Sequence, residues 1–178
     1  MITLLLGTAI AFAGAPQDVE AMSVRPMSET EAVAEFENAC VRGIRDPAKV
    51  AETATHSARR YVEGQASAGD AGKVRNWSSP YGSVQYVDRE PGHDGRGFRE
   101  CSFTAFTRDR VNRRSLNSEL DAMAGRRAEA RLTAVEDGRH MGWIWRDAEG
   151  RRVALYSVAN PRTPNQITLS IQSEDSTE

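Results

Sequence analysis

Three carboxylates and a histidine fall within one short, glycine-rich stretch of the chain: Asp88, Glu90, His93 and Asp94. Histidine titrates near neutral pH, and a neighbouring carboxylate can orient its ring for proton transfer. Nitrogen and oxygen ligands this close together could also hold a divalent cation, but their spacing differs from that of an EF-hand loop. A solvated hairpin tip is the simpler interpretation. We therefore treat the four residues as a candidate loop site and expect no metal or other cofactor there.

The second candidate is a run of large apolar side chains. Met141, Trp143 and Trp145 alternate along an expected strand, so they share one of its sides. Tryptophan is enriched in binding hot spots, and an exposed Trp143 and Trp145 pair would form an interaction face. The alternative, which we favour, is that this side of the strand is buried under the helices.

Motifs of common catalytic sites are missing from the sequence. The stretch from Gly69 to Val74 resembles part of a phosphate-binding loop, but Ser67 stands where the first glycine is required and Val74 where a hydroxyl is required. No Gly-x-Ser-x-Gly or His-Glu-x-x-His pattern occurs. The other two histidines, His56 and His140, have no sequence neighbour that suggests catalysis.

The first fifteen residues have the pattern of a secretory leader. They carry no charged side chain and end in the small-residue triplets Ala11-Phe12-Ala13 and Ala13-Gly14-Ala15, which are typical of signal-peptide cleavage. The missing Lys or Arg before the apolar run departs from the usual pattern. The run is also too short to span a membrane, which takes about 20 residues. We expect cleavage after Ala13 or Ala15 and an exported protein, periplasmic or secreted, with no transmembrane span in the mature chain; an N-terminal helix of a cytosolic protein is the alternative.

The sequence contains two cysteines, Cys40 and Cys101. An even number of cysteines in an exported chain predicts a disulfide, and two free buried thiols are the alternative. The bridge would close a loop of about 60 residues and stabilise the fold by about 4 kcal/mol in the chain-entropy model.

Composition indicates an ordinary globular protein. The 178 residues are 39% hydrophobic and 27% charged, with a formal net charge of -2, so no overall positive field would attract nucleic acid. We expect no nucleic-acid partner. The many arginines and alanines are typical of a bacterial protein.

Helix signals occur in three places. Ser28 to Glu31 forms a capping box that opens an apolar stripe at helical spacing. Asp46-Pro47 predicts the start of a second helix that runs to Gly64. Asp109 is expected to cap a third helix that ends at Gly125.

Strand signals fill most of the remaining chain, over residues 73–77, 82–88, 98–107, 130–136, 139–146, 151–158 and 166–173. Asp137-Gly138 is a strong hairpin signal, and residues 65–72 are expected to be a flexible loop. Residues 166–173 alternate between apolar and polar side chains, which predicts a sheet with one face in water.

This order predicts an α+β fold: two N-terminal helices and one middle helix on one face of a mainly antiparallel sheet that ends in a four-stranded meander. Residues 16–27 would be a polar lead-in, residues 28–173 a single domain and residues 174–178 an acidic tail. We expect an exported, non-catalytic binding or interaction module whose partner is a protein or envelope component. The alternative is a secreted hydrolase-like enzyme with an acid-base site built from dispersed residues, including His93 and Asp94.

Overall fold

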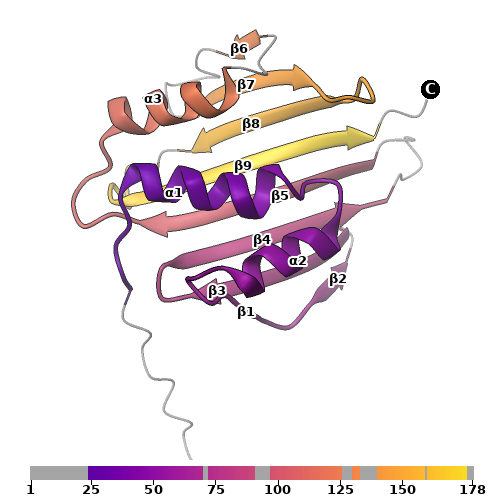
Figure 1. Cartoon of the computed structure of the whole chain (residues 1–178), viewed down its shortest axis with the longest axis horizontal. Coiled ribbons are helices and arrows are strands. Elements are labelled where there is room, and N and C mark those ends of the chain that lie inside the picture. Colours follow the sequence, from indigo (N-terminus) through magenta and orange to yellow (C-terminus); the bar gives the residue numbers. More distant parts are fainter. Residues whose placement is uncertain are drawn as a thin grey trace, which may run out of the picture.

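The computed structural model describes residues 24–69, 72–90, 97–125, 130–132, 140–158 and 160–175. Helices and strands follow one another along the chain in the order shown in Figure 1. Their bounds are α1 Glu29–Phe36, the π-helical segment η1 Glu37–Val41, α2 Pro47–His56, β1 Val62–Glu63, β2 Ser67–Gly69, β3 Gly72–Ser79, β4 Gly82–Arg89, β5 Gly97–Phe106, α3 Arg113–Ala124, β6 Ala130–Leu132, β7 His140–Arg146, β8 Arg152–Val158 and β9 Gln166–Asp175.

All the strands belong to one antiparallel sheet with the order β1-β3-β4-β5-β9-β8-β7-β6, and β2 also pairs with β3. The expected meander of the last four strands is confirmed, since β6 to β9 are neighbours in chain order. The longest pairing joins β5 to β9, from Gly97 opposite Asp175 to Phe106 opposite Gln166. This pairing connects two meanders that are separated in sequence by α3.

The three helices lie over one face of the sheet (Figure 1). Strand residues on that face are buried in a continuous core, including Phe103, Leu169, Leu155 and Trp143. Alternate residues on the same strands point to the other face. The α+β class predicted from the sequence is therefore correct, and so is the placement of the helices on a single face.

Local capping explains where α1 and α2 begin. Ser28 and Glu31 form the predicted capping box, with the Ser28 backbone N–H donating to Glu31 Oε2 at 2.9 Å. Asp46 caps α2 as predicted, and its Oδ1 accepts from the Ala48 backbone N–H at 2.9 Å. Both signals are local in the sequence, because the cap and its partners lie within three residues.

Three expectations about element bounds are wrong. Helix α2 ends at His56 rather than near Gly64, because Val62 and Glu63 pair with β3 as strand β1. Helix α3 is capped by Asn112 rather than Asp109, and the Asn112 side chain accepts from the Ser115 backbone N–H at 3.2 Å. The predicted flexible loop at residues 65–72 contains strand β2, which pairs with β3.

The last meander begins with β6 and ends with β9. Strand β9 runs to Asp175, two residues into the expected acidic tail. Strand β6 is seen over Ala130–Leu132, and the predicted Asp137-Gly138 turn lies outside the described residues. The signal-peptide region also lies outside them.

A disulfide joins Cys40 in η1 to Cys101 in β5, and both side chains are fully buried. This confirms the bridge predicted from the sequence. It ties the helical layer to a central strand across 61 residues of sequence. A hydrogen bond from the Tyr86 hydroxyl to the Ile44 carbonyl oxygen, at 2.9 Å, joins the same two layers nearby.

Among the helices in the described residues, none combines the length and hydrophobicity needed to cross a bilayer.

Candidate binding sites

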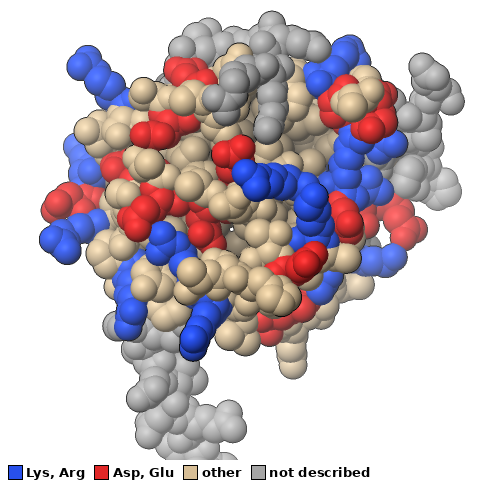
Figure 2. All heavy atoms as spheres, in the orientation of Figure 1, with Lys and Arg blue, Asp and Glu red and all other residues tan. Residues whose placement is uncertain are grey.

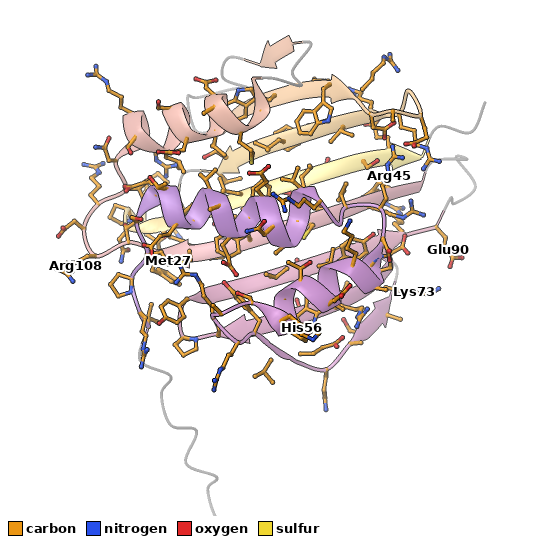
Figure 3. All side chains as sticks on the ribbon, in the orientation of Figure 1. Met27, Arg45, His56, Lys73, Glu90 and Arg108 are labelled. Atoms are coloured by element: carbon orange, nitrogen blue, oxygen red, sulfur yellow. A yellow bond between two sulfur atoms is a disulfide. The ribbon has the colours of Figure 1, made fainter. Side chains whose placement is uncertain are left out.

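The structure describes two of the four residues in the candidate loop site. Asp88 and Glu90 lie at the end of β4, whereas His93 and Asp94 lie outside the described residues. Asp88 forms an ion pair with Arg99 at 3.4 Å, and Glu90 forms one with Lys73 at 2.8 Å. Lys73 and Glu90 lie together at one end of the sheet (Figure 3). The two described carboxylates are therefore each matched by a basic side chain.

The Lys73–Glu90 pair favours its own charged state. The hydrogen bond from Lys73 holds the pKa of the Glu90 carboxyl below its ordinary value, and the Glu90 carboxylate in turn raises the pKa of Lys73. Both groups are therefore charged at neutral pH. Among the described residues, no group of three or more His, Cys, Asp or Glu side chains is arranged to hold a metal ion.

The tryptophan pair lies in the core. Trp143 is 1% exposed and Trp145 is 6% exposed, on the side of β7 that faces the helices. The Trp143 indole N–H donates to Asp121 Oδ1 of α3 at 2.9 Å. The burial of this side of the strand, which we favoured from the sequence, is confirmed. The two indoles therefore do not form an exposed interaction face.

The two remaining histidines are apart from each other. His56 is exposed at the end of α2, and its Nδ1 lies 2.9 Å from the Glu52 carbonyl oxygen (Figure 3). His140 begins β7, and its side chain is outside the described part of the chain.

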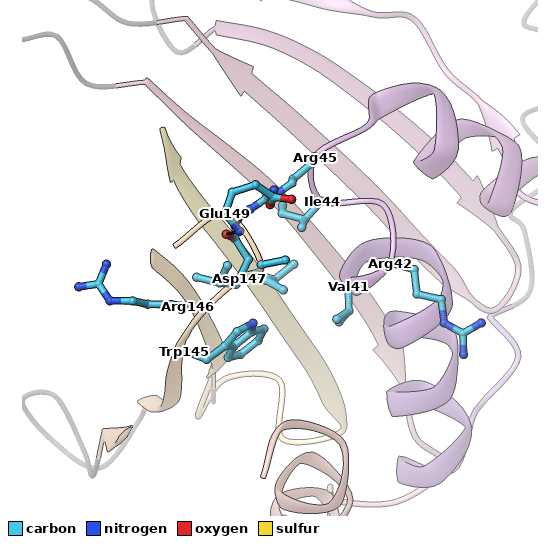
Figure 4. Close-up of a pocket in the computed structure, with 11 residues that line it drawn as sticks. Val41, Arg42, Ile44, Arg45, Trp145, Arg146, Asp147 and Glu149 are labelled. Atoms are coloured by element: carbon cyan, nitrogen blue, oxygen red, sulfur yellow. Dashed lines mark hydrogen bonds and ion pairs between the residues drawn. The ribbon is translucent and has the colours of Figure 1, made fainter. Parts of the chain in front are cut away.

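A pocket of 480 Å³ opens between the η1–α2 connection and the β7–β8 turn (Figure 4). Its apolar walls come from Val41, Ile44, Trp145, Val153 and Ile171. This volume is within the range of small-molecule sites, which are about 300–1,000 Å³.

Charged side chains surround the mouth of this pocket. Arg45 forms ion pairs with both Asp147 and Glu149, joining the connection before α2 to the β7–β8 turn. Asp147 also organises that turn, because its Oδ1 accepts from the backbone N–H groups of Glu149 and Arg151 at 2.9 and 3.0 Å. The ion pairs therefore hold the two walls of the pocket together.

The second candidate surface is the sheet face opposite the helices, which we call the neutral face. It lies on β3, β4, β5, β9, β8 and β7 and leaves out the end of these strands where Arg89, Arg152 and Glu174 lie. Its outward residues are Val74, Asn76, Ser78, Ser83, Gln85, Val87, Glu100, Ser102, Thr104, Thr168, Ser170, Gln172, Ala154, Tyr156, Val158 and Ile144. Most of these side chains are partly or fully exposed. No helix of the described chain lies against them.

Glu100 is the single charged residue of the neutral face. Its carboxylate accepts hydrogen bonds from the Ser170 hydroxyl at 2.6 Å, the Ser102 hydroxyl at 3.1 Å and the Gln172 amide at 3.1 Å. These donors come from β5 and β9, so the network crosses the central strand pair. The charge is spread over neutral partners rather than presented alone to solvent.

Both surfaces were missed by motif searching. The sequence signal for the neutral face was the alternation of polar and apolar residues over 166–173. That signal marks one strand, and no local pattern tells which strands lie beside it. The pocket had no such signal, because Ile44, Trp145 and Ile171 come together only through the tertiary fold.

No protein-family model matches the chain, and neither the curated proteins nor the solved structures contain one with significant similarity to it.

Proposed function

We propose that this chain is an exported binding module that docks a protein partner of the cell envelope on the neutral face of its sheet. The proposal is carried by a sheet face that no helix of the described residues covers. Its central rows present amide, hydroxyl and apolar side chains around one hydrogen-bonded carboxylate. Depletion of charge is what distinguishes the core of a protein interface from the remaining surface.

The contrast with the helical face supports this choice of surface. Basic and acidic side chains are intermixed over the helices (Figure 2), as on an ordinary solvated surface. On the sheet side, charged residues gather at one end, where Arg152 pairs with Glu174 at 3.4 Å and Arg89 lies 5.7 Å from the Phe98 ring. They form a charged margin beside the neutral face, in the manner of a polar interface rim.

The size of the neutral face also suits a protein partner. Six strands about 4.8 Å apart span about 25 Å, and the five residues from Val74 to Ser78, at about 3.3 Å per residue, extend about 16 Å along the strand. That corresponds to about 400 Å² before side-chain relief is added, half of the roughly 800 Å² per partner in a standard interface, so the charged margin would supply the rest of the contact.

Export is part of the proposal. The apolar leader at residues 1–15 supports it, and so does the Cys40–Cys101 bridge, because disulfides persist mainly in oxidising compartments. Mass spectrometry of the protein from its host should give a chain that begins at Gly14 or Pro16 and is oxidised at both cysteines. An unprocessed, reduced chain would contradict export.

The surface assignment can be tested by site-specific photo-crosslinking in the host. A photoreactive residue is placed at Gln85, which is exposed on the neutral face, or at Glu52, which is exposed on α2. We expect one defined adduct from the Gln85 position and none from Glu52.

A second substitution then ties the adduct to the surface. Thr168→Arg adds a charge to β9, one of the two middle strands of the neutral face, and should abolish crosslinking from Gln85, while Lys49→Glu on α2 should not affect it. No adduct from Gln85, or one that survives Thr168→Arg, would contradict the proposed surface.

A further inference from the structure

The pocket between the η1–α2 connection and the β7–β8 turn has walls that are already desolvated. Ile171 is fully buried, Val153 is 2% exposed and Ile44 is 7% exposed. Trp145 adds an aromatic ring to the same lining. These side chains form the floor of the pocket, and the partly buried Val41 adds accessible apolar surface beside them, against which a small apolar body could lie.

The charge at the pocket mouth is not balanced. Arg45 supplies one positive charge and meets two carboxylates, Asp147 and Glu149. Arg42 and Arg146 also line the pocket, but their guanidinium groups point away from its centre on opposite sides (Figure 4). The Arg146 guanidinium donates to the Gly150 carbonyl oxygen at 2.8 Å. The three groups that meet at the mouth, Arg45, Asp147 and Glu149, therefore carry a net charge of -1, whereas Arg42 and Arg146 at the flanks bring the whole lining to +1.

The two carboxylates differ in how much they can still bind. The Asp147 side chain is 15% exposed and accepts from two backbone N–H groups besides meeting Arg45. The Glu149 side chain is 54% exposed, and a carboxylate has about four acceptor positions. Glu149 is thus the group that can receive a ligand while Asp147 continues to hold the turn.

We propose that this pocket binds a small organic cation with an apolar body, of the aryl- or alkylammonium class. The apolar body would contact Val41, Ile44 and Val153, and the ammonium group would lie between the Glu149 carboxylate and the Trp145 ring. Aromatic faces attract ammonium groups, and the attraction strengthens where water is excluded. The pocket lies on the helical side of the sheet, so this inference does not depend on the neutral face.

The test is a titration of the full chain followed by ¹H–¹⁵N NMR, with three probes of similar shape: benzyltrimethylammonium, benzyl alcohol and benzenesulfonate. The chain has three tryptophans, and the Trp145 indole signal is assigned by its loss in Trp145→Phe. We expect the cation to shift the Trp145 indole signal and the amides of residues 147–150, with an affinity at least about tenfold higher than that of the anion.

The matched variants are Glu149→Gln at the pocket and Glu52→Gln on α2, both exposed. Glu149→Gln should weaken binding of the cation by roughly threefold to fivefold, because the coulombic attraction between an exposed carboxylate and the quaternary ammonium is lost, whereas Glu52→Gln should leave the affinity unchanged. Preserved dispersion of the NMR spectrum shows that each variant is folded. Tighter or equal binding of the anion or the alcohol, the absence of shifts at Trp145, or an unchanged affinity in Glu149→Gln would overturn the proposal.

Discussion

At the scale of single residues, Glu31 links the start of α1 to solution pH. Hydrogen bonds from the Ser28 backbone N–H and hydroxyl, at 2.9 and 2.8 Å, hold the pKa of the Glu31 carboxyl below its ordinary value, and Arg59 lowers it further. A carboxylate whose pKa falls on folding stabilises the native state above its unfolded pKa. That contribution is lost as the pH falls through the native pKa.

Glu31→Gln tests this linkage, because glutamine retains the capping-box geometry but not the charge. We expect the variant to be less stable than the natural chain at neutral pH. The difference should shrink as the pH falls below about 4.5 and disappear once Glu31 is protonated. Denaturant unfolding at several pH values measures it; a difference that is independent of pH would mean that the charge has no role.

Tyr86 shows what a single buried hydrogen bond contributes. Its hydroxyl donates to the Ile44 carbonyl oxygen at 2.9 Å, and the side chain is 1% exposed. Tyr86→Phe removes the donor and leaves a buried carbonyl without this partner, so the free energy of unfolding should fall by about 1–2 kcal/mol. Tyr156→Phe on the partly exposed neutral face is the control and should change it by less than about 0.5 kcal/mol. Equal effects from the two variants would contradict the assigned contact.

At the scale of elements, the start of α3 differs from the one that the sequence predicted. Asp109 and Asn112 are both good N-cap residues, and the chain uses Asn112. The Asn112 backbone N–H donates to Glu29 Oε1 at 2.7 Å, which places the start of α3 against α1. A contact distant in sequence thus accompanies the choice between two locally acceptable caps.

The two caps can be compared directly in unfolding experiments. Asn112→Ala should lower the free energy of unfolding by about 1 kcal/mol, because the Ser115 backbone N–H loses its acceptor. Asp109→Ala should change it by less than about 0.5 kcal/mol. The reverse order would mean that α3 begins at the earlier residue.

At the scale of the whole molecule, the disulfide and the β5–β9 pairing hold together parts of the chain that are far apart in sequence. The bridge fixes the helical layer to β5, and β5 in turn pairs with β9 over ten residue pairs. The binding surfaces proposed above both depend on this arrangement. The neutral face extends across β5 and β9, and the pocket lies between η1 and the β7–β8 turn.

Removing the bridge should therefore weaken the whole domain. In the double variant Cys40→Ala/Cys101→Ala, the free energy of unfolding should fall by about 4 kcal/mol, because the unfolded chain regains the entropy of a loop with a sequence separation of 61 residues. Denaturant unfolding measures the change, and the natural chain under reducing conditions should show a similar loss. If the free energy of unfolding fell by less than about 1 kcal/mol in both the double variant and the reduced natural chain, the bridge would contribute little to stability beyond the packing of the core.

The sequence alone determined the features that depend on neighbours along the chain. Ser28 with Glu31 and Asp46 with Pro47 identified two helix starts, because a cap and the backbone groups it satisfies lie within one turn. Alternation in residues 166–173 correctly identified a strand with one buried and one wet face, since side chains on a strand alternate with a period of two. These signals, with the order of the segments, were sufficient for the α+β class and the final meander.

Only the tertiary structure decided what depends on pairing and burial across the chain. Val62 and Glu63 had the spacing of a helix, but pairing with β3 turned them into a strand. Nothing local in β5 indicates that β9 lies beside it, and so neither the extent of the neutral face across the strands nor the Glu100 network could be read from the sequence. The same holds for the pocket, where Ile44, Trp145 and Glu149 meet because two distant turns are brought together. Burial and strand pairing gain their free energy from contacts between residues that are distant in sequence. A local sequence pattern does not contain the information on which of these residues meet.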